Sequence, residues 1–348
     1  MTHASVGPEE RILITGAAGF IGSRVVSEML RAGHTNLRLF VRPSSNLARV
    51  KSVIEAFPEA RVEVLSGNLL SRDDCAKAAG GAAVIVHLAA SSEKTFAGSY
   101  MSCVVSTRNL LDAAVQAGCL RRFVNVSSFA VYSNAKLPHN GLLDESCELD
   151  SHVLDRFEAY AYAKLKQEKL VEQYGREFQL PYVHVRPGAV YGPGAPHLSG
   201  RIGIDTFGVF MHLGGSNQLP LTYVDNCARA IVLAGITPGV DGEAFNVVDD
   251  DLPSSGRFLR MYKKQGKKLR SIRVPYWVFY SFSWAWEKYS RSSEGQLPAA
   301  FNRNRCATYW KGNRYSNQKI KDRLGWRQVV PFPEAARRYF DYVRTASL

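Results

Sequence analysis

The sequence predicts an α/β fold, built on a doubly wound parallel sheet with a smaller, discontinuous C-terminal lobe. In the first half of the chain, short runs rich in Val, Ile and Leu alternate with longer segments of helical periodicity. Continuous apolar strands of this kind are typical of a parallel sheet that is covered by helices on both faces. With 348 residues, the chain is long enough to form one large domain with insertions or two ordinary domains.

The expected elements alternate regularly as far as Pro187. Strands are expected at 11–15, 37–41, 61–65, 83–89, 122–127 and 182–186, with helices at 19–30, 46–56, 71–79, 99–117 and 157–174. The later expected elements are an extended piece ending at 223–224, helices at 227–236 and 334–344, and a strand at 244–248. We therefore expect a sheet domain formed by residues 1–187 with about 219–249, and a lobe formed by 188–218 and 250–348.

Composition and cysteine spacing exclude several classes of protein. Apolar residues make up 46% of the chain and charged residues 22%, which is typical of a globular protein. The six cysteines are scattered without a C-x-x-C pair, which argues against a disulfide framework and a structural zinc site, so no metal is expected. No segment resembles a signal peptide, and no apolar run is long enough to span a bilayer. We therefore expect a cytoplasmic protein.

Positive charge is concentrated in the C-terminal quarter. The formal net charge is +13, but residues 254–348 alone carry +16 and the preceding residues carry −3. Such a field suits an anionic substrate, an acidic partner or a lipid headgroup surface, and equally a solvated basic face. No nucleic-acid-binding signature accompanies the charge, so we do not expect a nucleic-acid partner.

An aromatic segment, PYWVFYSFSWAW (275–286), lies within this basic quarter. It is too short to span a membrane. We expect it to form a buried helix or the wall of a pocket rather than a contact with a membrane surface.

The sequence TGAAGFIG (15–22) predicts a nucleotide site, because it follows the first strand and opens the first helix. In this context Gly16 makes the tight turn, Gly19 lets the backbone approach a pyrophosphate, and Gly22 allows close packing of the helix. The spacing alone would be weak evidence in a chain with 28 glycines. Its position at the first strand-to-helix junction makes it a strong indication of a Rossmann dinucleotide site.

The end of the second strand predicts which dinucleotide is preferred. Folds that prefer NAD usually place an acidic residue there to bind the ribose 2′-hydroxyl. This chain has Arg42, followed by Ser44 and Ser45. A cation and hydroxyl groups suit a 2′-phosphate, so NADP is favoured and NAD is the alternative.

Further motifs occur in a consistent order: VHLAA (86–90), STRNLLDAA (106–114), VSSFAVYS (126–133), YAYAK (160–164), VRPGAVYGPG (185–194) and YVDNCARA (223–230). Together they resemble the extended short-chain dehydrogenase/reductase superfamily, the NAD-dependent epimerase/dehydratase group that includes 3β-hydroxysteroid-dehydrogenase-like and dihydroflavonol-reductase-like enzymes. The resemblance covers essentially the whole chain. It implies an NAD(P)-dependent enzyme with a small-molecule substrate, and a homodimer formed through the helices near 99–117 and 157–174.

The resemblance also implies Ser128, Tyr160 and Lys164 as catalytic residues. The Y-x-x-x-K pattern alone does not single out Tyr160, because it starts at residues 132, 160, 162 and 315. The family pattern has a small residue before the lysine and a glutamate four residues after it, and Ala163 and Glu168 satisfy both conditions.

Tyr162 and Lys166 form the competing pair on the same expected helix. Tyr160 and Tyr162 lie about 200° apart around the helix axis, so both pairs cannot face one cleft. Leu165, which is not small, precedes Lys166. We therefore interpret Tyr162 as a packing or substrate-pocket residue.

A tyrosine and a lysine one helical turn apart are suited to proton transfer. A free phenol has a pKa of about 10, which is too high for an efficient base at neutral pH. A lysine four residues later shares its helical face and can stabilise the phenolate. Tyr160 would exchange a proton with a substrate oxygen while hydride moves to or from nicotinamide. The resemblance implies that Lys164 also holds the nicotinamide ribose and that Ser128 hydrogen-bonds the substrate oxygen.

Other residues are implied as cofactor contacts by the same resemblance. Asn68 stands where the family usually has an aspartate that contacts adenine, and its amide oxygen can still accept a hydrogen bond. The full expected set is Gly16, Gly19, Phe20, Ile21, Gly22, Arg42, Asn68, Leu69, Ala89, Ala90, Tyr160, Lys164, Pro187 and Gly188. His87, on an apolar strand, is interpreted as a core residue.

Departures from the family pattern favour one substrate class. Nucleotide-sugar enzymes usually carry an asparagine at the position of Ala189 and an arginine near Leu219, and dehydratases carry an acidic pair where Phe129 follows Ser128. Our main hypothesis is therefore an oxidoreductase acting on a secondary alcohol or ketone of substantial apolar size. The alternatives are a nucleotide-sugar 4-epimerase or related enzyme, and a catalytically idle NADP-binding scaffold, which the retained Ser, Tyr and Lys set disfavours.

Overall fold

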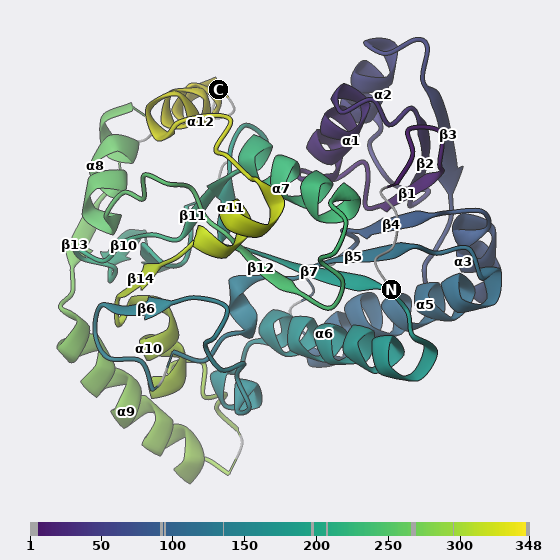
Figure 1. The fold of residues 1–348 in the computed structure, drawn as a ribbon. Helices are drawn as coiled ribbons and strands as arrows, with labels where there is room; N and C mark the ends of the chain where they lie inside the picture. Colours follow the sequence, from purple (N-terminus) through teal and green to yellow (C-terminus); the bar gives the residue numbers. More distant parts are fainter. Residues whose placement is uncertain are drawn as a thin grey trace.

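A seven-stranded sheet, parallel throughout, forms the centre of the molecule (Figure 1). The computed structural model describes residues 6–90, 93, 95–134, 136–195, 198–206, 208–265, 269–294 and 296–345. The strand order is β3-β2-β1-β4-β5-β7-β12, which confirms the predicted doubly wound Rossmann fold. The strands are β1 (Ile12–Thr15), β2 (Asn36–Val41), β3 (Arg61–Ser66), β4 (Val84–His87), β5 (Arg122–Val126), β7 (Tyr182–Pro187) and β12 (Ala244–Val247).

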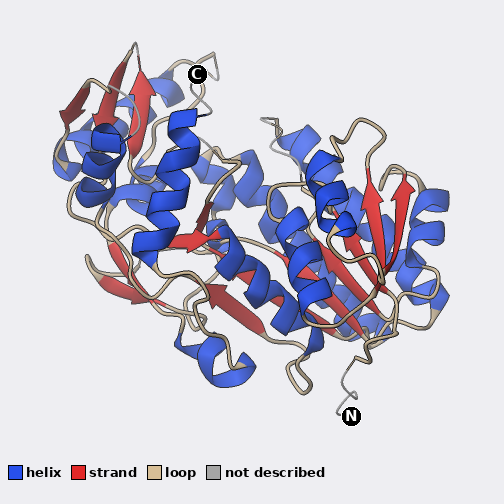
Figure 2. Cartoon of the chain, turned by 90° about the horizontal axis from the view of Figure 1, so that it is seen from above, coloured by secondary structure: helices blue, strands red, loops and turns tan. Residues whose placement is uncertain are grey.

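Helices cover both faces of this sheet, because alternate strand residues point to opposite sides. Ile12 and Ile14 pack into one core, whereas Leu13 between them packs into the other. The first core lies under α1 (Gly22–Arg31), α2 (Ala48–Glu55) and α7 (Val224–Ile236), and the second under α3 (Arg72–Ala79), α5 (Ser106–Ala117) and α6 (Ala159–Phe178). Figure 2 shows the strands of the sheet between these helices, with the second lobe beside them.

The single helix expected at 99–117 is interrupted. It consists of α4 (Phe96–Tyr100), a π-helical turn η1 (Met101–Val105) and α5. The Cys103 carbonyl in this turn accepts hydrogen bonds from Thr107 Oγ1 and, at 3.4 Å, from Gln167 Nε2 of α6. Such turns occur frequently at functional sites.

The second lobe is built from several small sheets and helices. Its largest core contains aromatic residues such as Tyr191, Phe258 and Tyr339. The strands outside the central sheet are β6 (Gly141–Leu143), β8 (Ala189–Tyr191), β9 (Gly203–Thr206), β10 (Val209–His212), β11 (Leu221–Tyr223), β13 (Ser271–Arg273) and β14 (Asn313–Tyr315). The late helices are α8 (Ser255–Gln265), α9 (Tyr276–Ser292), α10 (Arg303–Trp310), α11 (Gln318–Leu324) and α12 (Phe332–Thr345).

The aromatic segment forms α9, and the expectation that it would be a buried helix is wrong. Phe279, Ser283 and Ser290 are its buried residues, whereas Trp277 is 71% exposed. The helix lies at the periphery of the second lobe and packs beside α10 through one face (Figure 1). Among the described helices, none has the length and apolar character needed to cross a bilayer.

Candidate active site

A cleft of about 1050 Å³ opens at the carboxyl ends of the sheet strands. This is the edge at which doubly wound sheets bind their ligands. The cleft also reaches the first turns of α6 and the π-helical turn before α5. Its lining includes every residue expected from the sequence, namely Gly16, Gly19, Phe20, Ile21, Gly22, Arg42, Asn68, Leu69, Ala89, Ala90, Ser128, Tyr160, Lys164, Pro187 and Gly188.

The glycine turn after β1 has the geometry of a phosphate cradle. Gly16 has φ of 70°, and a Cβ there would lie 3.0 Å from the Ala89 backbone nitrogen. A Cβ on Gly22 would lie 2.1 Å from the Gly16 carbonyl oxygen, so a larger residue cannot occupy this position without moving the turn. The Gly19 N–H donates to the same carbonyl at 2.9 Å, and α1 begins at Gly22 rather than at Gly19. Backbone N–H groups at such a helix start suit the pyrophosphate of a dinucleotide.

Arg42 lies exposed on the cleft, directly after β2. Its backbone N–H donates to Ser45 Oγ at 3.2 Å, which shapes the turn that also places Ser44 on the cleft. Within the described part of the chain, the Arg42 guanidinium forms no ion pair. It is therefore available to an anionic ligand.

The loop after β3 is fixed by hydrogen bonds to two helices. The Asn68 backbone N–H donates to Asp74 Oδ2 at 2.9 Å, and the Leu69 carbonyl accepts from Asn109 Nδ2 at 3.0 Å. Asn68 Oδ1 accepts from the Leu70 N–H at 3.0 Å, and no other described residue engages its second lone pair or its NH₂ group, which suit a ligand.

Ser128 and Tyr160 both line the cleft, and the Ser128 hydroxyl accepts a hydrogen bond from the Ala130 N–H at 3.2 Å. The surrounding protein desolvates the phenol and raises the pKa of Tyr160 to about 12, although the nearby Ser128 hydroxyl acts to lower it. Tyr160 is 39% exposed, so a molecule in the cleft can reach it. The neutral phenol is thus the stable form, and it can donate a proton.

Lys164 lies one helical turn after Tyr160 and is almost completely buried. Among the described residues, its Nζ donates to the Val126 carbonyl at 2.8 Å and to Gln167 Oε1 at 2.9 Å. An ammonium has three N–H donors, so one is left for a ligand in the cleft. Burial lowers the pKa of Lys164.

The competing tyrosine lies elsewhere. The Tyr162 ring packs against Phe96 and Tyr100, with centroid distances of 5.6 and 6.4 Å, and Lys166 Nζ lies 5.6 Å from the centre of the Tyr162 ring. Neither Tyr162 nor Lys166 lines the cleft. The structure therefore brings Ser128 together with Tyr160, and it places Tyr162 among packing residues.

Glu168, one further turn along α6, anchors the helix to the sheet. Arg186 of β7 donates to both of its carboxylate oxygens, at 3.0 and 2.7 Å, and also to the Tyr132 hydroxyl at 2.8 Å. Burial raises the pKa of Glu168, but nearby His184 and Arg186 outweigh this and lower it, so the carboxylate stays ionised. Glu168, Glu172 and His184 are close enough together to hold a metal ion, but Arg186 already occupies both oxygens of Glu168.

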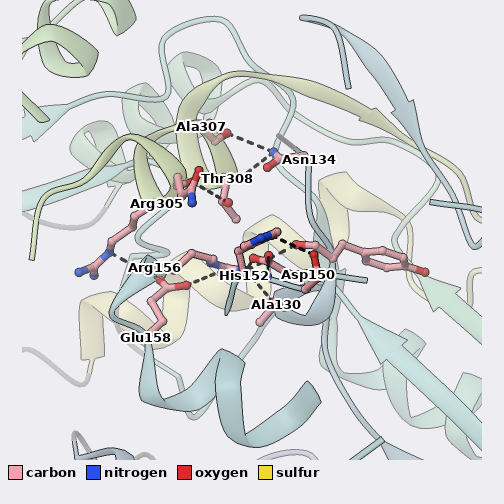
Figure 3. A network of polar contacts seen from close by, with 12 residues as sticks. Ala130, Asn134, Asp150, His152, Arg156, Glu158, Arg305, Ala307 and Thr308 are labelled. Carbon is pink, nitrogen blue, oxygen red and sulfur yellow. Dashed lines mark hydrogen bonds and ion pairs between the residues drawn. The ribbon is translucent and has the colours of Figure 1, made fainter. Parts of the chain in front are cut away.

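A further buried cation, Arg156, connects the turn after Ser128 with Asp150 and with the residue before α6 (Figure 3). It donates to the Ala130 carbonyl at 2.8 Å, next to the Ser128 turn, and forms ion pairs with Asp150 and with Glu158, which precedes α6. Arg305 of α10 reaches the same Glu158 at 3.6 Å, as Figure 3 shows. The sequence analysis did not identify this network. Asp150, Arg156 and Glu158 are close in sequence but form no recognised motif, and Ala130 and Arg305 join them only through the tertiary fold.

His87 is a core residue, as expected. It is completely buried, and its ring nitrogens lie 2.8 and 2.9 Å from the hydroxyls of Thr15 and Thr107. Burial lowers its pKa to about 3, so it is neutral. Three cleft residues that the sequence analysis missed are Glu93, Ser102 and Ser106. Ser106 begins the STRNLLDAA motif, but that motif alone does not indicate a position on the cleft. Ser102 lies in the π-helical turn and Ser106 directly follows it.

The chain is similar to several known proteins. A 3β-hydroxysteroid dehydrogenase from Mycolicibacterium neoaurum is 27% identical, over 95% of this chain and 91% of the relative. A 3β-hydroxysteroid-dehydrogenase/decarboxylase (isoform 2) from Arabidopsis thaliana is 25% identical over 98% of this chain, which spans 63% of that longer protein. An uncharacterised UDP-glucose epimerase from Bacillus subtilis is 28% identical over 68% of this chain and 76% of its own length.

Solved structures show the same fold. UDP-glucuronic acid 4-epimerase from Bacillus cereus, in complex with UDP-glucuronic acid and NAD, matches 97% of this chain and 99% of its own, with a TM-score of 0.71 and 22% identity. The sequence model of the NAD dependent epimerase/dehydratase family matches residues 12–247. The chain therefore belongs to the NAD-dependent epimerase/dehydratase family and is an NAD-dependent enzyme.

Proposed function

We propose that the chain is an NAD(P)-dependent oxidoreductase that transfers hydride between nicotinamide and a secondary alcohol or ketone. The observation that carries this proposal is that Ser128, Tyr160 and Lys164 line the same cleft as the glycine turn. Residues 1–187 with about 219–249 would form the cofactor domain. Residues 188–218 and 250–348 would form the substrate lobe.

The proposed roles follow from the positions of the side chains. The bound dinucleotide supplies or accepts the hydride. Tyr160 donates a proton to the substrate oxygen during reduction and removes it during oxidation, and Ser128 donates a hydrogen bond to the same oxygen. Lys164 holds the nicotinamide ribose with its free N–H, and its charge favours the phenolate.

The substrate we propose is a molecule of substantial apolar size. Leu219 and Leu221 are buried in the aromatic core of the second lobe, so neither can contribute a donor to a nucleotide diphosphate. Ala189 likewise lacks the amide that the nucleotide-sugar enzymes carry. Burying phosphate charges without partners is very costly. The two relatives named as hydroxysteroid dehydrogenases, which match almost the whole chain, support the same substrate class.

A substrate panel tests this proposal. With NADPH, large apolar ketones should oxidise the cofactor at a measurable rate, followed as loss of nicotinamide absorbance. UDP- and dTDP-sugars should give no new sugar nucleotide by chromatography. Clean conversion of one of these sugars would instead establish the alternative, a nucleotide-sugar 4-epimerase or related enzyme, which the Bacillus subtilis relative represents.

We infer that NADP is preferred over NAD, with Arg42 binding the 2′-phosphate. Arg42→Asp should weaken NADP(H) binding about tenfold or more, because a carboxylate replaces a charged hydrogen-bond donor. Binding of NAD(H) should change little. Calorimetric titration of both cofactors measures the effect, and Lys51→Asp, which changes an exposed cation of α2, serves as the control. Equal losses for the two cofactors, or tighter NAD(H) binding by the wild type, would contradict the assignment.

We also infer a homodimer formed through α5 and α6, and a cytoplasmic location. Relatives of this architecture support the first inference by analogy alone. All six cysteines are free thiols, which agrees with a reducing compartment.

A further inference from the structure

Helix α9 presents an aromatic face to solvent. This face consists of Trp277, Val278, Tyr280, Phe282, Trp284 and Tyr289, and all six are exposed. Trp277 and Tyr289 are 71% and 61% exposed, and Ile272 of the preceding strand β13 adds a further side chain at 60%. Soluble proteins rarely leave so many large apolar side chains together in water without a function.

The opposite side of α9 is firmly packed, so the aromatic face cannot turn inward. Phe279 contacts Trp310 and Phe301 with ring centroids 5.2 and 5.9 Å apart. The indole N–H of Trp286 donates to the Pro298 carbonyl at 3.2 Å, and Arg303 pairs with Glu287 at 3.1 Å. The helix is therefore held as a rigid element with one face permanently outward.

Charge along α9 is confined to its second half. From Pro275 to Trp286 there is no charged residue. Arg270 and Arg273 precede the helix and are exposed, and Lys288 and Arg291 are exposed near its end. Lys288 Nζ lies 4.3 Å from the centre of the Trp284 ring, at the border of the aromatic face. The one acidic residue of α9, Glu287, is engaged by Arg291 and Arg303. The face is thus uncharged in its middle and basic at both ends.

We propose that this face docks onto an anionic lipid surface. Trp and Tyr side chains prefer the boundary between headgroups and acyl chains, where the ring is buried and the polar tip stays wet. Basic side chains beside such a face are attracted to anionic headgroups. The segment from residue 254 to the end carries +16, which adds a long-range attraction. A short amphipathic helix lies along the interface and does not cross the bilayer.

A second copy of the chain is a poorer occupant of this face. If two α9 helices met in parallel, each basic end would face the same basic end of the other copy. If they met in antiparallel fashion, Arg270 and Arg273 of one copy would face Lys288 and Arg291 of the other. No unpaired acidic residue of α9 is available to compensate. An anionic lipid surface complements both basic ends at once. The proposal does not depend on the reaction that the cleft performs.

Sedimentation with vesicles tests the proposal on the full chain. The wild type should bind vesicles of phosphatidylcholine that contain phosphatidylglycerol and should bind pure phosphatidylcholine much more weakly. Its tryptophan emission should move to the blue on binding, and added salt should weaken binding because charge is screened. The double variant Trp277→Ser/Trp284→Ser should lose at least about tenfold in partition coefficient. Lys288→Ala should lose about fivefold, the effect of one basic side chain near the surface.

Phe178→Ser is the matched control, because Phe178 is an exposed aromatic residue at the end of α6, away from α9. It should bind vesicles like the wild type, and all variants should keep the wild-type circular dichroism spectrum and cofactor affinity. The proposal is overturned if the wild type does not bind the anionic vesicles, or if Phe178→Ser loses as much binding as the double tryptophan variant. It is also overturned if sedimentation velocity shows a dimer that only the tryptophan variant dissociates, since the face would then pair two copies.

Discussion

Replacing Tyr160 with phenylalanine should lower kcat about 10³-fold and leave the Kd for the cofactor nearly unchanged. The substitution removes the hydroxyl that exchanges the proton with the substrate oxygen, and general acid and base catalysis contributes an effect of about this size. The ring itself stays in place on α6, so the cleft keeps its shape. Steady-state rates with an apolar ketone and a separate titration of the cofactor measure the two quantities.

Two variants of the same helix serve as controls for this result. Tyr162→Phe should keep most of the activity, because Tyr162 packs against Phe96 and does not line the cleft. Lys164→Met should lower kcat and weaken the cofactor as well, since Lys164 is proposed to act on both. An inactive Tyr162→Phe variant beside an active Tyr160→Phe variant would show that the wrong tyrosine has been assigned.

Replacing Arg156 with methionine should lower the free energy of unfolding by about 3 to 5 kcal/mol. Arg156 is 1% exposed, and the substitution would leave Asp150 and the nearby Ala130 carbonyl without their buried partner. Removing one member of a buried ion pair has a cost of about this size, because the remaining charge stays desolvated. Urea unfolding measures the change.

The control for this variant is an ion pair on the surface. Lys136→Met breaks the pair with Glu148, whose side chains are both largely exposed, and should change the free energy of unfolding by less than about 1 kcal/mol. If the two variants lost equal and small amounts of stability, the Arg156 network would not hold the two sides of the site together.

Most of the sheet was predictable from the sequence because its strands, apart from the largely exposed edge strand β3, are buried on both faces. A strand such as β4 reads VIVH, and burial of every residue leaves a continuous apolar run between polar helices. The glycine turn was equally predictable, since close approach of the backbone at Gly22 permits no side chain. In both cases the physical requirement acts on residues that are neighbours in the chain.

The missed features depend on residues that are distant in sequence. Arg186 meets Glu168 and Arg305 meets Glu158 through the tertiary fold, and no local spacing predicts either pair. The aromatic segment shows a different reason. Its composition predicts an apolar helix face, but it does not say whether another part of the same chain will cover that face, and here α10 covers only one side.

The pairing of β6 with β14 has a consequence for how the protein is made. These parallel strands join residues 141–143 to residues 313–315, and Asn134 donates to the carbonyls of Ala307 and Thr308 at 3.1 and 3.2 Å. The ribosome synthesises the Ser128 turn long before it synthesises residues 307–308 and 313–315. The nascent chain therefore carries β6 without its β14 partner until residues 313–315 have been made. The partner of β6 is thus made only after the Ser128 turn and α6 have both been synthesised.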